Sequence, residues 1–228
     1  MAKIIAIRHV EFENLGFFED IFKELGFDYT YLDTPKGERL NSGLEDVSGI
    51  VILGGYMGAY EEDKYEFLKY EYEVMEEAFK KKLPLIGICL GAQMIAKFLG
   101  ARVYKGERGK EIGWYEIFKT GEHPYFEEFP ERLKVLQWHG DTFDLPKGAT
   151  RVYSSEKYPN QAFVFEKAVA LQFHIEVKLK DLPTWISAYE KELKEVGISK
   201  DELLNTDVKE EVLKDLCRRL VKKIFGIK

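Results

Sequence analysis

Short apolar and β-branched runs alternate with amphipathic stretches over the first hundred residues of the chain. The runs have the length and composition of strands, and they lie at residues 3–7, 29–32, 49–53 and 85–88. The amphipathic stretches repeat their apolar positions every three or four residues, as helices do, and they lie at 15–25, 65–79 and 92–99. Strands separated by helices of this length predict a doubly wound α/β sheet whose strands are mostly parallel.

The helix predicted at 65–79 has the most regular apolar face of the three. Asp63 and Glu66 form a capping pair at its start. We expect its apolar face to contact the sheet and to bury Phe79. This face comprises Tyr65, Leu68, Tyr72, Met75 and Phe79.

The pattern changes between residues 102 and 173, where short alternating runs are separated by turns and no long helix is indicated. These runs predict an antiparallel extension of the sheet, and they lie at 113–117, 133–136, 161–165 and 168–173.

The chain becomes helical again after Glu176. The pattern predicts one helix from Trp185 to Val196, a capping box of Ser199 and Glu202, and a last helix that Asp207 and Glu210 open. One face of the last helix is apolar and comprises Leu213, Leu216, Leu220 and Ile224. We therefore predict an α/β domain over residues 1–181 and a helical appendage over 182–228 that packs on the same domain.

Composition and charge narrow the functional classes. The chain has 34 Lys and Arg against 40 Asp and Glu, and this net charge of −6 argues against a nucleic-acid partner. The longest uncharged stretch, 83–96, is too short for a spanning helix, which needs about 20 apolar residues. We therefore expect no membrane partner. Only two cysteines occur, Cys89 and Cys217, so a disulfide framework is excluded and a cytoplasmic setting is expected.

Cys89 lies where a predicted strand passes into a helix, with Gly87 and Gly91 two positions on either side. Such a sharp turn needs glycine because a Cβ would clash with the crowded backbone. At the helix N-terminus the dipole lowers the pKa of a thiol and favours the nucleophilic thiolate. A buried structural cysteine is the alternative, but the glycines favour a nucleophile. Cys217 lies on the apolar face of the last helix and is interpreted as packing.

His174 and Glu176 follow the strand predicted at 168–173. In open α/β sheets, ligands collect at the carboxyl ends of the strands. The spacing puts both side chains on one side of an extended segment, so Glu176 could orient the imidazole. A lone histidine is more often structural, but the presence of Cys89 favours a Cys–His–Glu triad. His9 and His123 are interpreted as structural.

Gly54 and Gly55 follow the strand predicted at 49–53. Their backbone N–H groups could point at a ligand, as an oxyanion hole requires. A phosphate-binding loop is the rival interpretation, but no Gly-Lys-Ser/Thr follows. No other cluster of His, Cys and acidic residues suggests a metal site, so neither a metal nor another cofactor is expected.

These motifs together resemble those of the class I (Cys-His-Glu triad) glutamine amidotransferases, whose fold is flavodoxin-like. Gln137-Trp-His-Gly-Asp141 is similar to the equivalent segment of the GMP-synthase glutaminase domain. Tyr56 stands where many relatives have proline. The segments that carry the resemblance are Gly87-Ile-Cys-Leu-Gly91-Ala-Gln93, Gly54-Gly55 and His174-Ile-Glu176.

The resemblance implies a hydrolase of the side-chain amide of L-glutamine. Cys89 would attack the amide carbon, and the N–H groups of Gly55 and Leu90 would hold the oxyanion. His174, oriented by Glu176, would protonate the departing ammonia and then activate water against the glutamyl thioester. Of the implied substrate-binding residues, Gln93 would contact the amino-acid end of the substrate, and the backbone around Trp138, His139 and Gly140 would complete the pocket. A structural imidazole is the alternative for His139.

Three hypotheses follow for the activity. The chain lacks the Ser-Gly-Gly-x-Asp-Ser loop of an ATP-pyrophosphatase, so the first is a free-standing glutaminase that delivers ammonia to a separate synthetase subunit. The second is a hydrolase of γ-glutamyl amides or peptides that uses the same triad. The third is a binding module whose triad is vestigial, and the intact triad counts against it.

Overall fold

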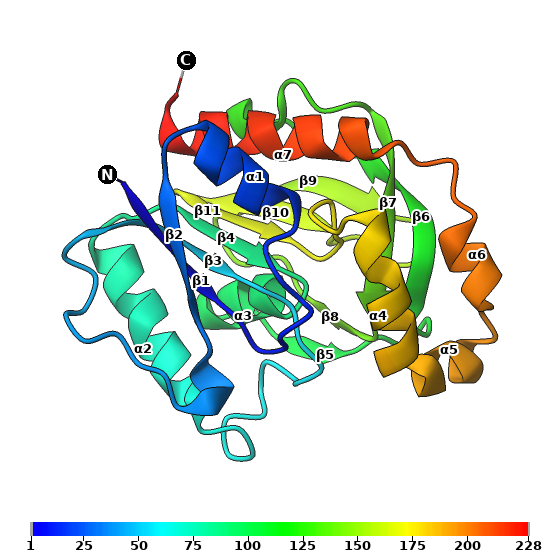
Figure 1. Ribbon diagram of the computed structural model, residues 1–228, viewed down its shortest axis with the longest axis horizontal. Coiled ribbons are helices and arrows are strands. Elements are labelled where there is room, and N and C mark those ends of the chain that lie inside the picture. Colours follow the sequence, from blue (N-terminus) through cyan, green and yellow to red (C-terminus); the bar gives the residue numbers. More distant parts are fainter. Residues whose placement is uncertain (1, 228) are drawn as a thin grey trace.

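Residues 2–227 are described in a computed structural model, and a nine-stranded sheet runs through the middle of the molecule (Figure 1). Its strand order is β2-β1-β3-β4-β11-β10-β9-β6-β7. The first five strands are parallel: β2 (Asp28–Leu32), β1 (Lys3–Ile7), β3 (Val47–Ile52), β4 (Leu85–Ile88) and β11 (Ala168–Leu171). The other four are antiparallel: β10 (Ala162–Phe165), β9 (Thr150–Ser155), β6 (Glu111–Lys119) and β7 (Arg132–His139).

This architecture confirms the predicted α/β fold, a doubly wound parallel sheet with an antiparallel extension and C-terminal helices. Three short strands were not foreseen. These are β9 and the separate antiparallel pair of β5 (Val103–Lys105) and β8 (Asp141–Phe143). Their sequences carry few alternating apolar positions, and pairing with neighbouring strands makes them regular.

Helices cover both faces of the sheet (Figure 1). On one face lie α1 (Phe17–Glu24) and α7 (Glu210–Phe225), whose apolar sides share one buried cluster with the strands. On the other face lie α2 (Phe67–Lys80) and α3 (Leu90–Phe98). The predicted apolar face of the last helix is confirmed, because all four of its residues are buried.

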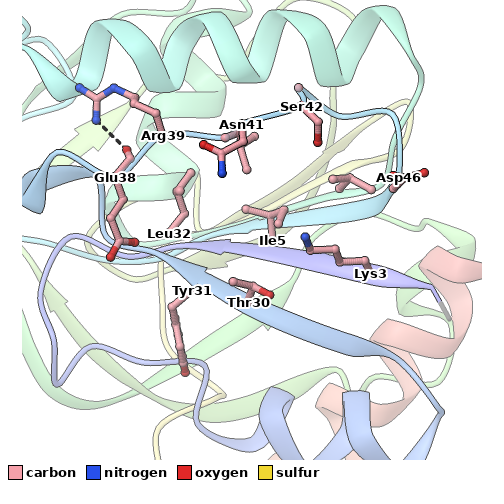
Figure 2. Close-up of a pocket in the computed structure, with 13 residues that line it drawn as sticks. Lys3, Ile5, Thr30, Tyr31, Leu32, Glu38, Arg39, Asn41, Ser42 and Asp46 are labelled. Atoms are coloured by element: carbon pink, nitrogen blue, oxygen red, sulfur yellow. Dashed lines mark hydrogen bonds between the residues drawn. The ribbon is translucent and has the colours of Figure 1, made fainter.

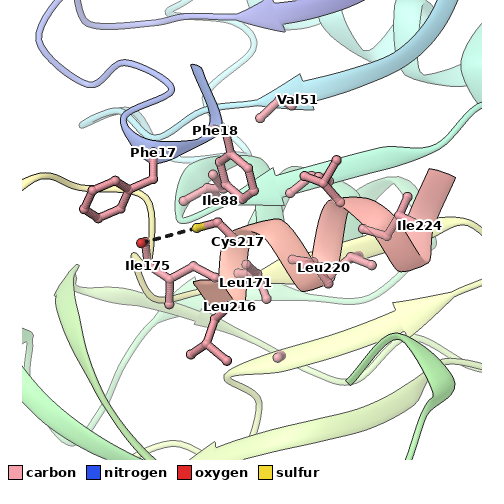
Figure 3. Close-up of a cluster of buried hydrophobic side chains, with 14 of the residues drawn as sticks. Phe17, Phe18, Val51, Ile88, Leu171, Ile175, Leu216, Cys217, Leu220 and Ile224 are labelled. Atoms are coloured by element: carbon pink, nitrogen blue, oxygen red, sulfur yellow. Dashed lines mark hydrogen bonds between the residues drawn. The ribbon is translucent and has the colours of Figure 1, made fainter. Parts of the chain in front are cut away.

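The α7 helix packs on the same core as the strands (Figure 3). Cys217 lies fully buried between Leu216 and Leu220 on this helix, and its thiol donates a hydrogen bond to the carbonyl of Ile175 at 3.4 Å. The division of the chain at residue 181 stays a proposal.

The C-terminal segment before α7 is more broken than predicted. The single helix expected from Trp185 to Val196 is two helices, α4 (Leu182–Ala188) and α5 (Glu190–Val196), which are separated by the non-helical backbone of Tyr189. The capping box of Ser199 and Glu202 is present at the start of α6 (Lys200–Leu204). Short 3-10 helices complete the structure at Thr34–Lys36, Pro124–Phe126 and Leu179–Asp181.

The predicted capping pair at the start of α2 is wrong, and of the two residues expected to open the last helix only Glu210 lies in its first turn. Neither Asp63 nor Glu66 caps α2, which begins at Phe67 without a side-chain hydrogen bond at its N-cap. Asp207 lies before the N-cap of α7 and accepts a hydrogen bond from Lys134 at 2.6 Å.

The buried face of α2 is also rotated from the predicted one. The buried residues are Leu68, Glu71, Val74, Met75 and Ala78, whereas Phe79 is half-buried and stacks on Phe98 with ring centroids 4.9 Å apart. The rotation brings the acidic side chain of Glu71 inward, where it is hydrogen-bonded to His9 at 2.8 Å. A hydrogen-bonded ion pair can enter the interior where a lone charge cannot.

Candidate functional site

Four loops that follow neighbouring parallel strands converge at one edge of the sheet. They follow β1, β3, β4 and β11, and the strand order reverses between β1 and β3. The carboxyl edge at such a reversal is the usual ligand site of an open α/β sheet. A pocket of about 480 Å³ opens there, and its walls include Glu13, Gly55, Cys89, Gln93, Trp138, His139, Gly140, Trp185 and Tyr189.

Cys89 occupies a strained turn between β4 and α3. Its φ of 52° and ψ of −106° are rarely adopted by residues other than glycine. A Cβ on Gly87 would lie 2.5 Å from the Gly91 carbonyl oxygen, and one on Gly91 would lie 2.0 Å from the Ile52 carbonyl oxygen. Both flanking positions therefore require glycine, as the sequence indicated. The turn presents the thiol to the pocket, where Cys89 is 6% exposed.

His174 and Glu176 lie in the segment that follows β11. The strand β11 ends at Leu171 rather than at Phe173, and His174 is held beyond it by a backbone hydrogen bond to the Leu136 carbonyl at 2.8 Å. His174 Nδ1 is 2.6 Å from a Glu176 carboxylate oxygen. Within residues 2–227, His174 Nε2 has no hydrogen-bond partner. The imidazole is therefore oriented through one nitrogen and free at the other.

Cys89 and His174 both lie next to Gly54. A Cβ placed on Gly54 would lie 3.5 Å from His174 Cε1 and 3.6 Å from Cys89 Cβ. The two side chains therefore flank the same point in space. The ring of Trp185 packs edge-on against the imidazole with centroids 5.1 Å apart, and it covers His174 from the side of α4.

Burial and charge act in opposite directions on the pKa values of this pair. Burial lowers the pKa of His174, but attraction to Glu176 and the neighbouring Cys89 outweigh it, and the pKa rises well above its ordinary value. Burial raises the pKa of Cys89 more than His174 lowers it. The lowered thiol pKa predicted from the helix N-terminus is therefore wrong for the free site. Burial thus opposes ionisation of the Cys89 thiol, and attraction to Glu176 favours the protonated form of His174.

Gly55 lines the pocket, and Leu90 directly follows the pocket residue Cys89. The backbone N–H of neither residue donates a hydrogen bond to an acceptor in the described part of the chain. A Cβ on Gly55 would lie 3.2 Å from Leu90 Cδ2, so the two residues are in contact range. His9 Nδ1 is hydrogen-bonded to the Gly54 carbonyl at 3.0 Å, which fixes the peptide unit that carries the Gly55 N–H.

The four predicted substrate-binding residues line the pocket together. The Gln93 side-chain amide donates to Gln172 Oε1 at 3.1 Å. Both ring nitrogens of His139 are engaged, with Glu111 Oε2 at 2.8 Å and with the Asp141 carbonyl at 2.8 Å. His139 therefore has a structural imidazole, and only its backbone is left to meet a ligand.

Sequence reasoning missed Glu13, Trp185 and Tyr189. Glu13 is 5% exposed and follows β1, and its position after a parallel strand was a usable signal. The hydroxyl of Tyr189 donates a hydrogen bond to Glu13 Oε1. Burial raises the pKa of Glu13, against the lowering effects of Tyr189 and His174. Nothing in the helical pattern marked Trp185 or Tyr189 as residues of the pocket.

A second cavity of similar size lies between the first strands and the loop that precedes β3 (Figure 2). Its volume is about 400 Å³, and its lining includes Lys3, Thr30, Arg39 and Asp46 but no cysteine or histidine. Arg39 donates to the Glu38 carbonyl at 2.7 Å. Size therefore does not separate the two cavities, but the first is lined by the Cys89 thiol, beside which His174 lies, and the second has neither group in its lining.

Neither a metal-binding cluster nor a membrane-spanning helix is found in the described part of the chain. Within residues 2–227, no three His, Cys, Asp or Glu side chains are arranged to hold a metal ion. In that same part of the chain, no helix has the length and apolar character needed to cross a bilayer.

Comparison with known proteins agrees with this geometry. The family model described as glutamine amidotransferase class-I matches residues 18–188. The putative glutamine amidotransferase-like protein YfeJ of Salmonella typhimurium is 30% identical over 192 residues, which cover 81% of this chain and 80% of that protein. The glutamine-hydrolyzing GMP synthase of Thermomicrobium roseum is 35% identical over 130 residues, which cover 57% of this chain but 23% of that enzyme.

A solved structure extends the likeness to almost the whole chain. A glutamine amidotransferase from Thermotoga maritima superposes with a TM-score of 0.94 and 56% sequence identity, over 98% of both chains. The likeness includes the C-terminal helices that follow residue 188. The chain belongs to the class I glutamine amidotransferase family.

Proposed function

We propose that the chain hydrolyses the side-chain amide of L-glutamine through a triad of Cys89, His174 and Glu176. The observation that carries the proposal is the His174 imidazole, whose Nε2 has no partner among residues 2–227 and whose Cε1 lies beside the same point as Cβ of Cys89, a residue on a strained turn. A nucleophile, a base with one free nitrogen and a carboxylate on the other nitrogen are the three parts of such a site. Membership of the family supports glutamine as the substrate.

In this mechanism, His174 Nε2 takes the thiol proton as Cys89 Sγ attacks the amide carbon. The N–H groups of Gly55 and Leu90 hold the resulting oxyanion. Collapse of the tetrahedral intermediate breaks the C–N bond, and His174 returns the proton to the departing ammonia. Water then attacks the glutamyl thioester while His174 takes its proton. Collapse of that second intermediate releases glutamate, and the proton returns to the thiol.

The ammonia acceptor in this proposal is a separate synthetase protein. Support comes from the Thermomicrobium roseum relative, a glutamine-hydrolyzing GMP synthase of which only 23% matches this chain. Most of that GMP synthase therefore lies outside the segment that matches this chain.

A hydrolase of γ-glutamyl amides or peptides is the second candidate, and the mouth of the pocket favours it. Tyr56 and Tyr60 line the pocket and are 62% and 47% exposed. Aromatic side chains at a pocket mouth offer apolar area to a substituent on the γ-nitrogen.

The test is covalent labelling with 6-diazo-5-oxo-L-norleucine, an electrophile that mimics glutamine, followed by intact-mass measurement. We expect a single adduct that maps to Cys89, that glutamine blocks, and that the Cys89→Ser variant lacks. Cys217→Ser is the matched control because its thiol is buried outside the pocket, and this variant should label like the wild type.

The hydrolysis products separate the two candidates. Release of ammonia from glutamine, with no amine released from γ-glutamyl-methylamide, supports the glutaminase. The reverse preference supports the hydrolase. An adduct on Cys217 alone contradicts both candidates, whereas an adduct on Cys89 that glutamine does not block contradicts the glutaminase.

A further inference from the structure

Glu13 is a buried carboxylate that the triad mechanism does not use. It lies in the loop after β1 and is 5% exposed, yet it forms part of the pocket wall. One carboxylate oxygen, Oε1, accepts the hydrogen bond from the Tyr189 hydroxyl. The other oxygen, Oε2, has no hydrogen-bond partner among residues 2–227. A buried carboxylate oxygen that lacks a partner and faces a pocket can accept a hydrogen bond from a bound ligand.

The free oxygen lies close to the reacting groups. A Cβ on Gly54 would be 2.3 Å from Glu13 Oε2, and that same point is 3.5 Å from His174 Cε1 and 3.6 Å from Cys89 Cβ. Glu13 is therefore packed on Gly54 beside the thiol and the imidazole. In the sequence, Glu13 is far from Gln93 and from residues 138–140, which line the same pocket.

The chemistry of amide cleavage indicates which atom of the substrate Glu13 Oε2 could contact. The oxyanion faces the N–H groups of Gly55 and Leu90, so the amide nitrogen must face His174, which protonates it as it leaves. That nitrogen carries two N–H donors in glutamine and gains a third as ammonia. A carboxylate oxygen beside His174 can accept one of these hydrogens and stabilise the positive charge that develops on the nitrogen.

We propose that Glu13 is a further catalytic residue, which accepts a hydrogen bond from the γ-amide nitrogen of glutamine and from the departing ammonia. Tyr189 is its positioning residue, because its hydroxyl occupies the other carboxylate oxygen and turns Oε2 toward the pocket. This inference rests on the proposed glutaminase function. Under this proposal, the break between α4 and α5 contributes to the reaction because it holds Tyr189, which positions Glu13.

The test compares two substrates that differ only at the leaving atom. L-Glutamine has N–H donors there, and the γ-methyl ester of L-glutamate has none. Both compounds pass through the same glutamyl thioester on Cys89. We expect Glu13→Gln to lower kcat/KM for glutamine by about 30- to 100-fold, in line with the loss of one charged hydrogen bond to a transition state. The ester should change by less than about threefold.

Tyr189→Phe should shift the amide-to-ester ratio in the same direction by a smaller factor, about three- to tenfold. A matched control exists outside the pocket, where the Tyr31 hydroxyl donates to Glu19 in the same kind of pair. Glu19→Gln and Tyr31→Phe should leave the ratio unchanged.

The outcomes separate the two proposals. Equal losses on amide and ester in Glu13→Gln would show a structural carboxylate and overturn the inference, while the proposed function would stand. A wild type that hydrolyses neither compound would overturn the proposed function and this inference together. A ratio that falls in Glu13→Gln and Tyr189→Phe, but not in the controls, supports both.

Discussion

Residues 2–227 include three buried histidine–glutamate pairs, which differ in one respect. In each pair a ring nitrogen lies 2.6–2.8 Å from a carboxylate oxygen. His9, paired with Glu71, also bonds the Gly54 carbonyl through its second nitrogen. His139, paired with Glu111, bonds the Asp141 carbonyl in the same way. The second nitrogen of His174 has no partner within residues 2–227.

The comparison shows that pairing with a carboxylate does not by itself indicate catalysis. A histidine with both nitrogens engaged holds two segments of backbone together and has no site left for proton transfer. The His9 pair fixes the loop that carries Gly55, and the His139 pair fixes the segment that forms the pocket wall. Only the His174 pair combines an oriented ring with a nitrogen that is free to exchange a proton.

The largest expected effect is on activity. His174→Gln removes the ring whose Nε2 is proposed to exchange a proton with Cys89, and glutamine hydrolysis should fall by about 10³-fold. Steady-state ammonia release measures this loss. His139→Gln is the matched control, because both of its nitrogens are engaged, and its effect on the rate should be far smaller. Equal losses in the two variants would break the distinction between free and engaged histidines.

The next effect is on stability. His9→Ala leaves Glu71 buried without its ionic partner, and the free energy of unfolding should fall by about 3–5 kcal/mol. Urea denaturation measures the change. The double variant His9→Ala/Glu71→Ala should lose less than the sum of the two single variants, because they interact directly. Strict additivity would mean that the pair has no energetic coupling.

Phe79 tests the helix face that the His9–Glu71 pair imposes on α2. The ring is half-buried against Phe98, so Phe79→Ala should cost about 2 kcal/mol, less than the ~3–5 kcal/mol of a fully buried phenylalanine. Thermal or urea unfolding gives the value. Met75→Ala, on the buried face of the same helix, should cost more. The opposite order would place the wrong face inward.

The smallest effect is a pH dependence. Burial lowers the pKa of His9, but the attraction and hydrogen bond of Glu71 outweigh it, and the net pKa is raised. A raised folded-state pKa stabilises the protein fully below the unfolded pKa, about 6.5, and this contribution is lost as the pH rises through the folded value. The stability advantage of wild type over the double variant should therefore shrink between neutral and alkaline pH, as urea denaturation at the two pH values would measure. An advantage that grows with pH contradicts a charged His9.

The order of strands and helices was accessible to sequence reasoning because it depends on local patterns. Strand β4 has the predicted bounds. The two glycines around Cys89 indicated a sharp turn, and any other residue at either position would clash with the backbone. The faces and breaks of helices were less accessible. The inward face of α2 depends on His9, 62 positions before Glu71, and periodicity within the helix contains no information on that partner.

The sequence by itself determined the fold class, the strained turn and the set of residue types from which the candidate triad is drawn, because spacing and backbone sterics act within a few residues. Only the tertiary structure decided which histidine keeps a free nitrogen and which carboxylates join the pocket. Glu13 and Tyr189 are 176 positions apart and meet only when α4 and α5 pack beside the carboxyl edge of β1. The tertiary structure also decides the direction of each pKa shift, since both desolvation and the nearby charges depend on the segments that pack around the group.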